Sequence, residues 1–242
     1  MSRSLGVMEA IRTTLPQWLL EAFVAATLLG DLLLVAPALA LFYLVDVGSS
    51  IRRGRREDPL CSDRTAFLIA TVFGGLALVV LLESVFALPR PPAEFHVIEP
   101  SEFGFPSGHT MAATVFWGAL ALWLPYGRRS VRLGVAGTVV VLVATSRLAL
   151  GVHYLVDVVA SVAFGAVYLA AVGWLARDRP LRAFFVALGI ALAAAVAAGV
   201  NGRALLAVVG TAVGLVGWWL VEHPAIRRRV YGAADRLRSD ST

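Results

Sequence analysis

The sequence contains no lysine: all 21 of its basic residues are arginines. It contains a single cysteine, Cys61, which excludes an internal disulfide and matches no metal-binding pattern. Charged residues make up only 15% of the chain, whereas about a quarter is usual for a soluble globular domain. The N-terminus lacks a short apolar run ending in a small-residue cleavage site, so we expect no cleaved signal peptide.

Apolar residues are abundant, at 59% of the 242 residues, and the mean hydropathy is +0.79. This composition is typical of a polytopic membrane protein, and the length favours one domain. The net charge is +5. Because the arginines lie in short loops between apolar runs, we expect them to contact lipid headgroups, and we expect no nucleic acid partner.

Seven apolar runs are long enough to cross about 30 Å of hydrocarbon as helices. An earlier stretch, Leu15–Leu29, is shorter and contains Pro16 and Glu21, so we interpret it as an interfacial helix. The sequence therefore predicts an all-α fold, a polytopic transmembrane helix bundle of about seven spans. The predicted spans are 31–48, 65–88, 107–124, 131–150, 154–176, 181–200 and 203–221. The predicted parts are an N-terminal interfacial segment (1–30), a transmembrane core (31–176), two additional C-terminal spans (177–221) and a basic cytoplasmic tail (222–242).

Basic and arginine-poor connections alternate along the chain. The connection 89–106 carries three glutamates, Glu94, Glu99 and Glu102. Because basic loops stay on the cytoplasmic side of a cell membrane, we predict an outer N-terminus and a cytoplasmic C-terminus. The basic segments are 49–64, 125–132, 177–182 and the tail. The first contains Arg52, Arg53, Arg55, Arg56 and Arg64, and the tail contains Arg227, Arg228, Arg229, Arg236 and Arg238.

Three strings of polar residues lie at the ends of apolar runs, where polar groups are costly. The predicted topology puts all three at the outer face of the membrane, although hydropathy alone does not require it. We interpret this agreement as the sign of one assembled site. The strings are Arg90-Pro91, then Pro106-Ser107-Gly108-His109, then Ser146-Arg147 followed by His153 and Asp157.

The two arginines and the Ser107-Gly108 pair suit a phosphate ester as ligand. Arg90 and Arg147 can each bind phosphate oxygens in bidentate fashion. Ser107 and Gly108 follow a proline that favours the start of a helix, where backbone N–H groups and the helix dipole attract an anion. Gly108 also allows the backbone to approach the ligand closely.

The histidines suit the chemistry of phosphoryl transfer. His153 and Asp157 are four residues apart, so a helix places them on one face, where the carboxylate can fix the imidazole tautomer. The free ring nitrogen of His153 can then attack phosphorus. His109 can protonate the departing oxygen and later activate water.

Each string also has a purely structural interpretation. Ser107 can be a helix cap, His153 with Asp157 an interfacial hydrogen bond, and Arg147 a membrane anchor. Their joint position on one face, with one substrate chemistry, favours a catalytic site. Outside the strings, Asp31 is predicted to cap the first span.

The order of the three strings and their spacing resemble the signature of the phosphatidic acid phosphatase type 2 superfamily, membrane lipid-phosphate phosphatases related to vanadium haloperoxidases. The resemblance covers about residues 65–176. It implies a metal-independent phosphoric ester or diphosphate hydrolase without a cofactor, which works through a phosphohistidine. It assigns His153 as nucleophile, His109 as acid and Asp157 as orienting carboxylate. It assigns phosphate binding to Arg90, Ser107, Gly108 and Arg147.

The first motif departs from that signature. The family has a lysine seven positions before the arginine of Arg-Pro, and this chain has Glu83 there. A carboxylate at that depth in a span requires a partner or water, and we expect the partner to be Arg90 or Arg147. If Glu83 competes with substrate for that arginine, Glu83→Lys raises activity. If Glu83 positions the arginine, the same change lowers it. We favour competition.

The sequence thus leaves three hypotheses for function. The first is a phosphatase that hydrolyses a lipid phosphate or polyprenyl diphosphate at the outer face. The second is a phosphotransferase, in which an alcohol accepts the phosphoryl group from His153. The third is a non-catalytic lipid-phosphate binder or transporter, which the charge reversal at Glu83 favours.

Overall fold

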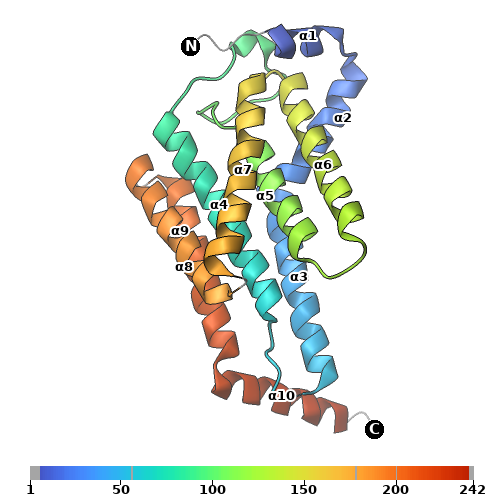
Figure 1. Ribbon diagram of the computed structural model, residues 1–242, viewed down its shortest axis with the longest axis vertical. Helices are drawn as coiled ribbons and strands as arrows, with labels where there is room; N and C mark the ends of the chain where they lie inside the picture. The colour runs from blue at the N-terminus through green and yellow to red at the C-terminus, as the bar shows by residue number, and fades with distance from the viewer. Residues whose placement is uncertain (1–5, 56, 178, 200, 240–242) are drawn as a thin grey trace.

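The computed structural model describes residues 6–55, 57–177, 179–199 and 201–239. The loop arginine Arg56 and the side chain of Arg238 lie outside the described part. The described residues form helices and loops without a β-strand (Figure 1). The predicted all-α transmembrane bundle is confirmed.

Six helices are long and apolar enough to cross a membrane, and they correspond to six of the seven predicted spans. Their apolar sequences explain both their helical form and their length, since a helix satisfies every backbone group internally where water is excluded. These helices are α3 (Leu32–Arg53), α4 (Asp63–Phe86), α6 (Arg129–Ala149), α7 (Leu155–Ala176), α8 (Pro180–Ala198) and α9 (Gly202–Glu222).

The remaining predicted span, 107–124, forms a shorter helix. This helix, α5 (Gly108–Trp123), has 16 residues and is therefore only about 24 Å long. It ends at Trp123 because Leu124 is extended, as expected for a residue that precedes a proline, Pro125. Most of α5 is buried among α4, α6 and α7.

The N-terminal segment consists of three short elements: α1 (Gly6–Thr14), α2 (Gln17–Thr27) and the 3-10 turn η1 (Leu28–Gly30). Figure 1 shows α1 across one end of the bundle, and α2 packs along α6. The turn η1 contacts α5 and leads directly into α3. The interfacial position of residues 1–30 stays a prediction.

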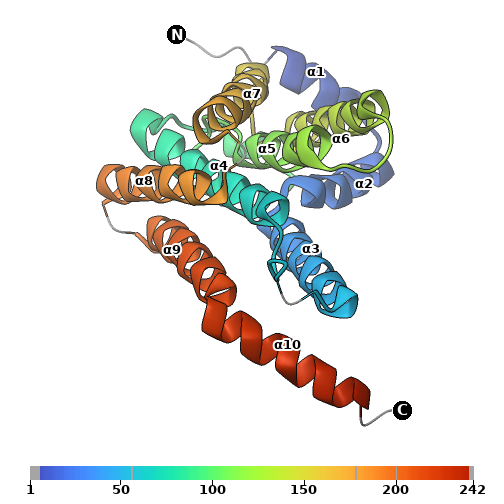
Figure 2. The same ribbon diagram turned by 60° about the horizontal axis from the view of Figure 1, so that its bottom comes forward.

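Helix α4 lies at the centre of the bundle. It contacts α5 on one side and α8 and α9 on the other (Figures 1 and 2). Its buried face includes Ala70, Gly74 and Ala77, small residues of the kind that let helices approach closely in membranes. Helices that follow one another in the chain run in alternating directions. The ends of α4, α6 and α8 and the starts of α5, α7 and α9 therefore lie toward the same side of the bundle (Figure 1). The three polar strings lie at this end.

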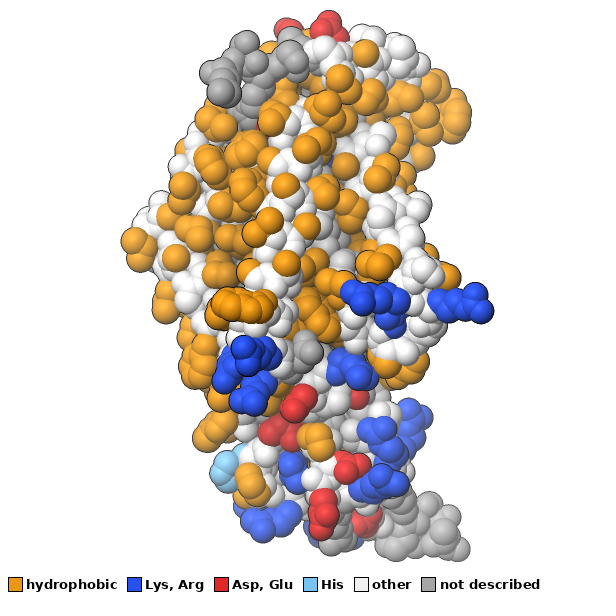
Figure 3. All heavy atoms as spheres, in the orientation of Figure 1, with side chains coloured by type: hydrophobic (Ala, Val, Ile, Leu, Met, Phe, Trp, Pro, Cys, Tyr) orange, Lys and Arg blue, Asp and Glu red, His pale blue; other side chains and the backbone are white. Residues whose placement is uncertain are grey.

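The opposite end of the molecule carries most of the arginines. Figure 3 shows hydrophobic side chains over the upper and middle parts of one face and arginines gathered toward its lower end. The predicted basic tail forms a helix there, α10 (Pro224–Ser239). Arg227 Nη2 donates to the carbonyl of Glu57 at 2.9 Å, and the Tyr231 hydroxyl donates to the carbonyl of Asp58 at 3.3 Å. These bonds attach the tail to the α3–α4 loop.

Candidate active site

Residues of all three polar strings meet around one cavity of about 470 Å³. Arg90 from the α4–α5 loop, Gly108 and His109 from the start of α5, and His153 from the α6–α7 loop line its wall. The other predicted site residues, Ser107, Arg147 and Asp157, are almost fully buried next to this wall. The structure therefore brings the predicted set together, with four members open to the cavity and three supporting it.

His153 is held by hydrogen bonds at both ring nitrogens. Its Nδ1 lies 2.9 Å from the carbonyl oxygen of Gly104 and 3.5 Å from Oδ2 of Asp157. Its Nε2 lies 2.9 Å from Nη1 of Arg90. Because a guanidinium only donates and a carbonyl only accepts, the proton is on Nδ1 and the lone pair is on Nε2. The Nε2 lone pair accepts the hydrogen bond from Arg90, and a bound phosphate would take the place of this contact.

The environment of His153 keeps the imidazole neutral. Burial above all, together with the charges of Arg147 and Arg90, lowers the pKa of His153 to about 3, although the hydrogen bond to Asp157 and the charge of Asp157 act in the opposite direction. An imidazole with this pKa carries no proton on Nε2 at neutral pH. His153 therefore has the protonation state that a nucleophile requires.

Asp157 is fixed at the start of α7. Its Oδ2 accepts a hydrogen bond from the backbone N–H of Tyr154 at 2.8 Å, which makes it part of a capping box. The side chain is fully buried, and its oxygen faces Nδ1 of His153. The carbonyl of Gly104 is the nearer acceptor for that nitrogen, and sequence reasoning missed it because a backbone carbonyl in a loop leaves no mark in a motif.

His109 pairs with Asp31, a residue 78 positions earlier in the chain. Nε2 of His109 lies 2.9 Å from Oδ2 of Asp31. Asp31 also caps α3, as predicted, by accepting from the backbone N–H of Leu33 at 2.8 Å. The contact requires the turn η1 to approach α5 closely, and a Cβ at Gly30 would lie 2.3 Å from the carbonyl oxygen of His109. Glycine at position 30 is what permits it.

The two arginines of the predicted phosphate clamp are held in fixed orientations. Arg90 donates from Nε to the carbonyl of Ser101 at 2.5 Å and from Nη1 to the carbonyl of Val152 at 2.9 Å. Arg147 donates from Nη1 to the hydroxyl of Thr27 at 2.9 Å, and its side chain is only 2% exposed. Fixed guanidiniums bind an oxyanion with little further loss of side-chain entropy.

Ser107 and Gly108 form the junction between the loop and α5. The Ser107 hydroxyl lies 3.0 Å from the hydroxyl of Thr110 and makes no capping hydrogen bond. A Cβ at Gly108 would lie 2.9 Å from Oε1 of Glu83. Gly108 is therefore the point at which α5 touches the end of α4.

The predicted partner of Glu83 is wrong. Its buried carboxylate pairs through Oε2 with Nη2 of Arg203 at 2.5 Å, and not with Arg90 or Arg147. Helix α9 packs on α4 and places Arg203, in its first turn, beside Glu83. The donors of Arg90 are directed to Ser101, Val152 and His153 instead. Glu83 is therefore not the partner of either arginine of the predicted phosphate clamp.

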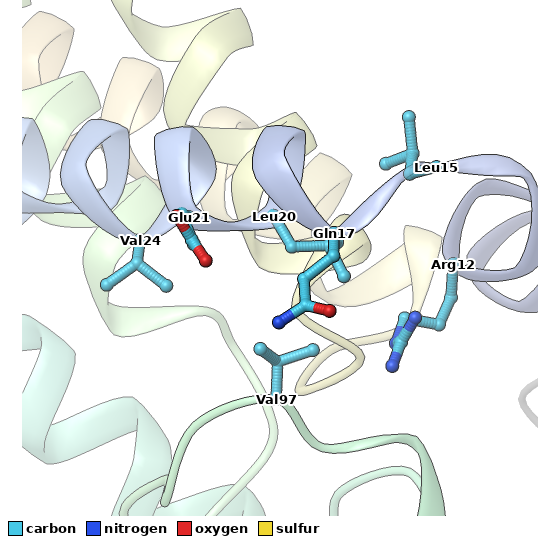
Figure 4. A pocket seen from close by; sticks show the side chains of 7 residues that line it. All are labelled: Arg12, Leu15, Gln17, Leu20, Glu21, Val24 and Val97. Atoms are coloured by element: carbon cyan, nitrogen blue, oxygen red, sulfur yellow. The ribbon is translucent and has the colours of Figure 1, made fainter.

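A second cavity, of about 410 Å³, lies between α2 and the α4–α5 loop (Figure 4). It includes no residue of the three polar strings. It is lined by Arg12, Leu15, Gln17, Leu20, Glu21, Val24 and Val97.

Known proteins resemble this chain in sequence and structure. The sequence model of the PAP2 superfamily matches residues 64–181, which include all three strings, and this match confirms the predicted resemblance. Phosphatidylglycerophosphatase B of Bacillus subtilis (strain 168) is 35% identical over 75 residues, which cover 28% of this chain and 37% of that relative. The crystal structure of a transmembrane PAP2 type phosphatidylglycerolphosphate phosphatase from Bacillus subtilis superposes with a TM-score of 0.57 at 25% identity, over 72% of this chain and 84% of that one.

Proposed function

We propose that this protein is an integral-membrane phosphatase that hydrolyses a lipid phosphate or polyprenyl diphosphate through a phosphohistidine on His153. The observation that carries the proposal is the arrangement of His153, with an unprotonated Nε2 facing Arg90 at the wall of a cavity that His109 also lines. A neutral nucleophile, a cation for the phosphate and a second imidazole are thereby placed around one space.

In the first step, Nε2 of His153 attacks phosphorus while the P–O bond to the leaving group breaks, which is an ester bond in a lipid phosphate and an anhydride bond in a polyprenyl diphosphate. The positive charge that develops on the ring is stabilised through Nδ1 by Gly104 and Asp157, 2.9 and 3.5 Å away. His109 protonates the leaving oxygen. Because an ionised carboxylate only accepts, Asp31 holds Nε2–H of His109, so Nδ1 is the nitrogen that transfers the proton.

In the second step, water attacks the phosphohistidine. His109, now without its second proton, takes one from the water as the water oxygen bonds to phosphorus. The P–N bond breaks, its electrons return to Nε2 of His153, and phosphate leaves. Arg90, which lines the cavity, stabilises the equatorial oxygens in both steps, and the charge of the buried Arg147 next to the wall adds to this stabilisation.

The surroundings of the cavity support a lipid as the substrate. A further cavity of about 380 Å³ shares Phe73 and Gly210 with the site cavity and is lined mainly by apolar residues of α3, α4 and α9. An apolar space next to a phosphate site suits a substrate with a hydrocarbon chain. The relatives' names make phosphatidylglycerophosphate the first substrate to test.

The test is phosphate release by the purified protein from phosphatidylglycerophosphate, phosphatidate and a polyprenyl diphosphate. We expect hydrolysis of at least one of these lipids at a rate far above that of a water-soluble phosphomonoester. Phosphate transfer to an added alcohol without release would instead indicate the phosphotransferase. Tight binding without turnover would indicate the non-catalytic binder.

Metal independence is a prediction from the donors at the site. The carboxylates of Glu83, Asp31 and Asp157 already face Arg203, His109 and His153, respectively, whereas Mg²⁺ binds through carboxylates and water. We expect EDTA to leave turnover unchanged. We expect orthovanadate to inhibit, because its trigonal-bipyramidal adduct resembles the transition state. Strict dependence on Mg²⁺ contradicts the mechanism.

We also predict that the active site faces the outside of the cell. In a Cys61→Ser background, Glu99→Cys lies in the exposed α4–α5 loop and Arg228→Cys on exposed α10. An impermeant maleimide is expected to label position 99 in intact cells and position 228 only after the membrane is opened. Labelling in the reverse order would move the site to the cytoplasmic face.

A further inference from the structure

The ion pair between Glu83 and Arg203 is open to the site cavity at one of its two ends. The Glu83 side chain is 2% exposed, whereas the Arg203 side chain is 46% exposed. Both residues line the cavity that also contains Arg90, His109 and His153. The buried carboxylate thus anchors a guanidinium that remains accessible from the cavity.

The Glu83 carboxylate has a fixed position relative to the start of α5. Oε1 of Glu83 lies against Gly108 at the start of α5, and Oε2 binds Nη2 of Arg203. A guanidinium has five N–H donors, so a contact through one edge leaves others for a second anion. Asn201 caps α9 by accepting from the N–H of Ala204 at 2.9 Å, which fixes the helix turn that carries Arg203.

Like charges gather at this cavity. Burial lowers the pKa of Arg90, and the nearby charge of Arg203 lowers it further, against the raising effect of Glu83. Two guanidiniums on one cavity wall repel each other unless an anion lies between them. An oxyanion that contacts His153 and Arg90 would lie in the cavity that Arg203 also lines.

We propose that Arg203 is a phosphate-binding residue of this enzyme and that Glu83 is the positioning residue that holds it. The cation that the family's first motif supplies as lysine at position 83 comes here from α9, beyond residues 64–181 that match the family. Helix α9 therefore adds a cation to the site, and Arg203 compensates for the charge reversal at Glu83. This inference rests on the proposed function and names a further residue for it.

The test is a charge-exchange series: Arg203→Ala, Glu83→Lys and the double variant Glu83→Lys/Arg203→Ala. Arg203→Ala leaves a buried, unpaired carboxylate beside the phosphate, and we expect kcat/KM to fall by about 100-fold, largely through KM. Glu83→Lys places a second cation beside Arg203, and we expect a loss of about 10-fold. In the double variant the introduced lysine supplies the cation, and we expect recovery to within about 10-fold of wild type.

The matched control is Arg129→Ala, which removes an exposed arginine from the first turn of α6, whereas Arg147 beside the site lies in the last turn of that helix. We expect its kinetics to equal those of wild type. Arg203→Lys keeps the charge and is expected to retain more activity than Arg203→Ala. If the alanine variant does not fold, the kinetics of Arg203→Lys are compared with those of wild type instead. A folded Arg203→Ala with wild-type kinetics, or a double variant no better than Arg203→Ala, overturns the proposal.

A binding measurement separates this proposal from the proposed function. Stabilisation of the purified protein by orthovanadate is expected to be strong for wild type and Arg129→Ala, lost in Arg203→Ala and regained in the double variant. If no lipid phosphate is hydrolysed but this order is seen, the proposed function fails and the phosphate-binding role of Arg203 stands. If hydrolysis is seen without this order in either measurement, only the role of Arg203 fails.

Discussion

His153→Ala is expected to reduce lipid-phosphate hydrolysis to the background rate, a loss of at least about 10⁴-fold. The substitution removes the imidazole whose unprotonated Nε2 lies 2.9 Å from Arg90 at the cavity wall. The chain has four histidines. The two that lie outside the site, His96 and His223, cannot replace His153 as nucleophile. His96 binds the carbonyl of Pro91 through Nε2 at 3.0 Å, and His223 lies at the far end of α9.

The matched control is His96→Ala, which removes an imidazole from the loop next to the site. We expect its turnover to stay within about twofold of wild type, since a substitution away from the reacting groups has a small effect. Thermal unfolding of both variants shows whether they remain folded. Turnover at the wild-type rate in folded His153→Ala would remove His153 from the mechanism.

The second large effect is expected from His109→Ala, and its size should depend on the leaving group. Loss of the acid is expected to slow release of a lipid alkoxide by about 10²- to 10⁴-fold. Release of 4-nitrophenolate, which leaves without protonation, is expected to slow much less in the first step. Asp31→Asn, which removes the carboxylate 2.9 Å from Nε2, is expected to give a smaller loss with the same dependence on the leaving group.

The comparison of the two substrates requires the rate of phosphoryl transfer to the enzyme, because His109 also serves the hydrolysis of the intermediate. A burst of 4-nitrophenolate in His109→Ala would show that the first step persists while the second is slow. Equal losses in the first step for the lipid and the aryl substrate would show that His109 is not the acid.

The positions of the long helices could be predicted because each depends on a local property of the chain, a continuous apolar run. The exception, α5, shows where this fails. Its apolar run reaches 107–124, but Pro125 makes Leu124 extended and the helix has 16 residues. Mean hydropathy over a window does not register a single proline, whereas that proline ends the helix by restricting the backbone of the residue before it.

The candidate site was predictable to the extent that its residues occur in strings. Pro106 to His109, and His153 with Asp157, are recognisable because their spacing matches a helix start or a helix face. Asp31 and Arg203 occur in no string, and each reaches the site only through the packing of η1 on α5 or of α9 on α4. The motifs contain no sign of either contact.

The wrong partner for Glu83 has the same origin. The predicted partners were the arginines of the motifs, whereas the structure pairs Glu83 with an arginine 120 residues later. One signal was present: Arg203 starts the last span, at the predicted outer face, where the other connections have few arginines. A buried carboxylate requires a nearby cation, and an arginine at that face was available.

The central claim, a phosphohistidine at His153, is tested most directly by trapping the intermediate. The purified protein is mixed with substrate labelled in its phosphate, quenched in alkali within the first turnover, and digested for mass spectrometry. A phosphoryl group on nitrogen survives alkali and is lost in acid. We predict label on the peptide that contains His153, with that behaviour, in wild type and in greater amount in His109→Ala. Label on another residue, or a wild-type enzyme that turns over with no label on His153, would contradict the account.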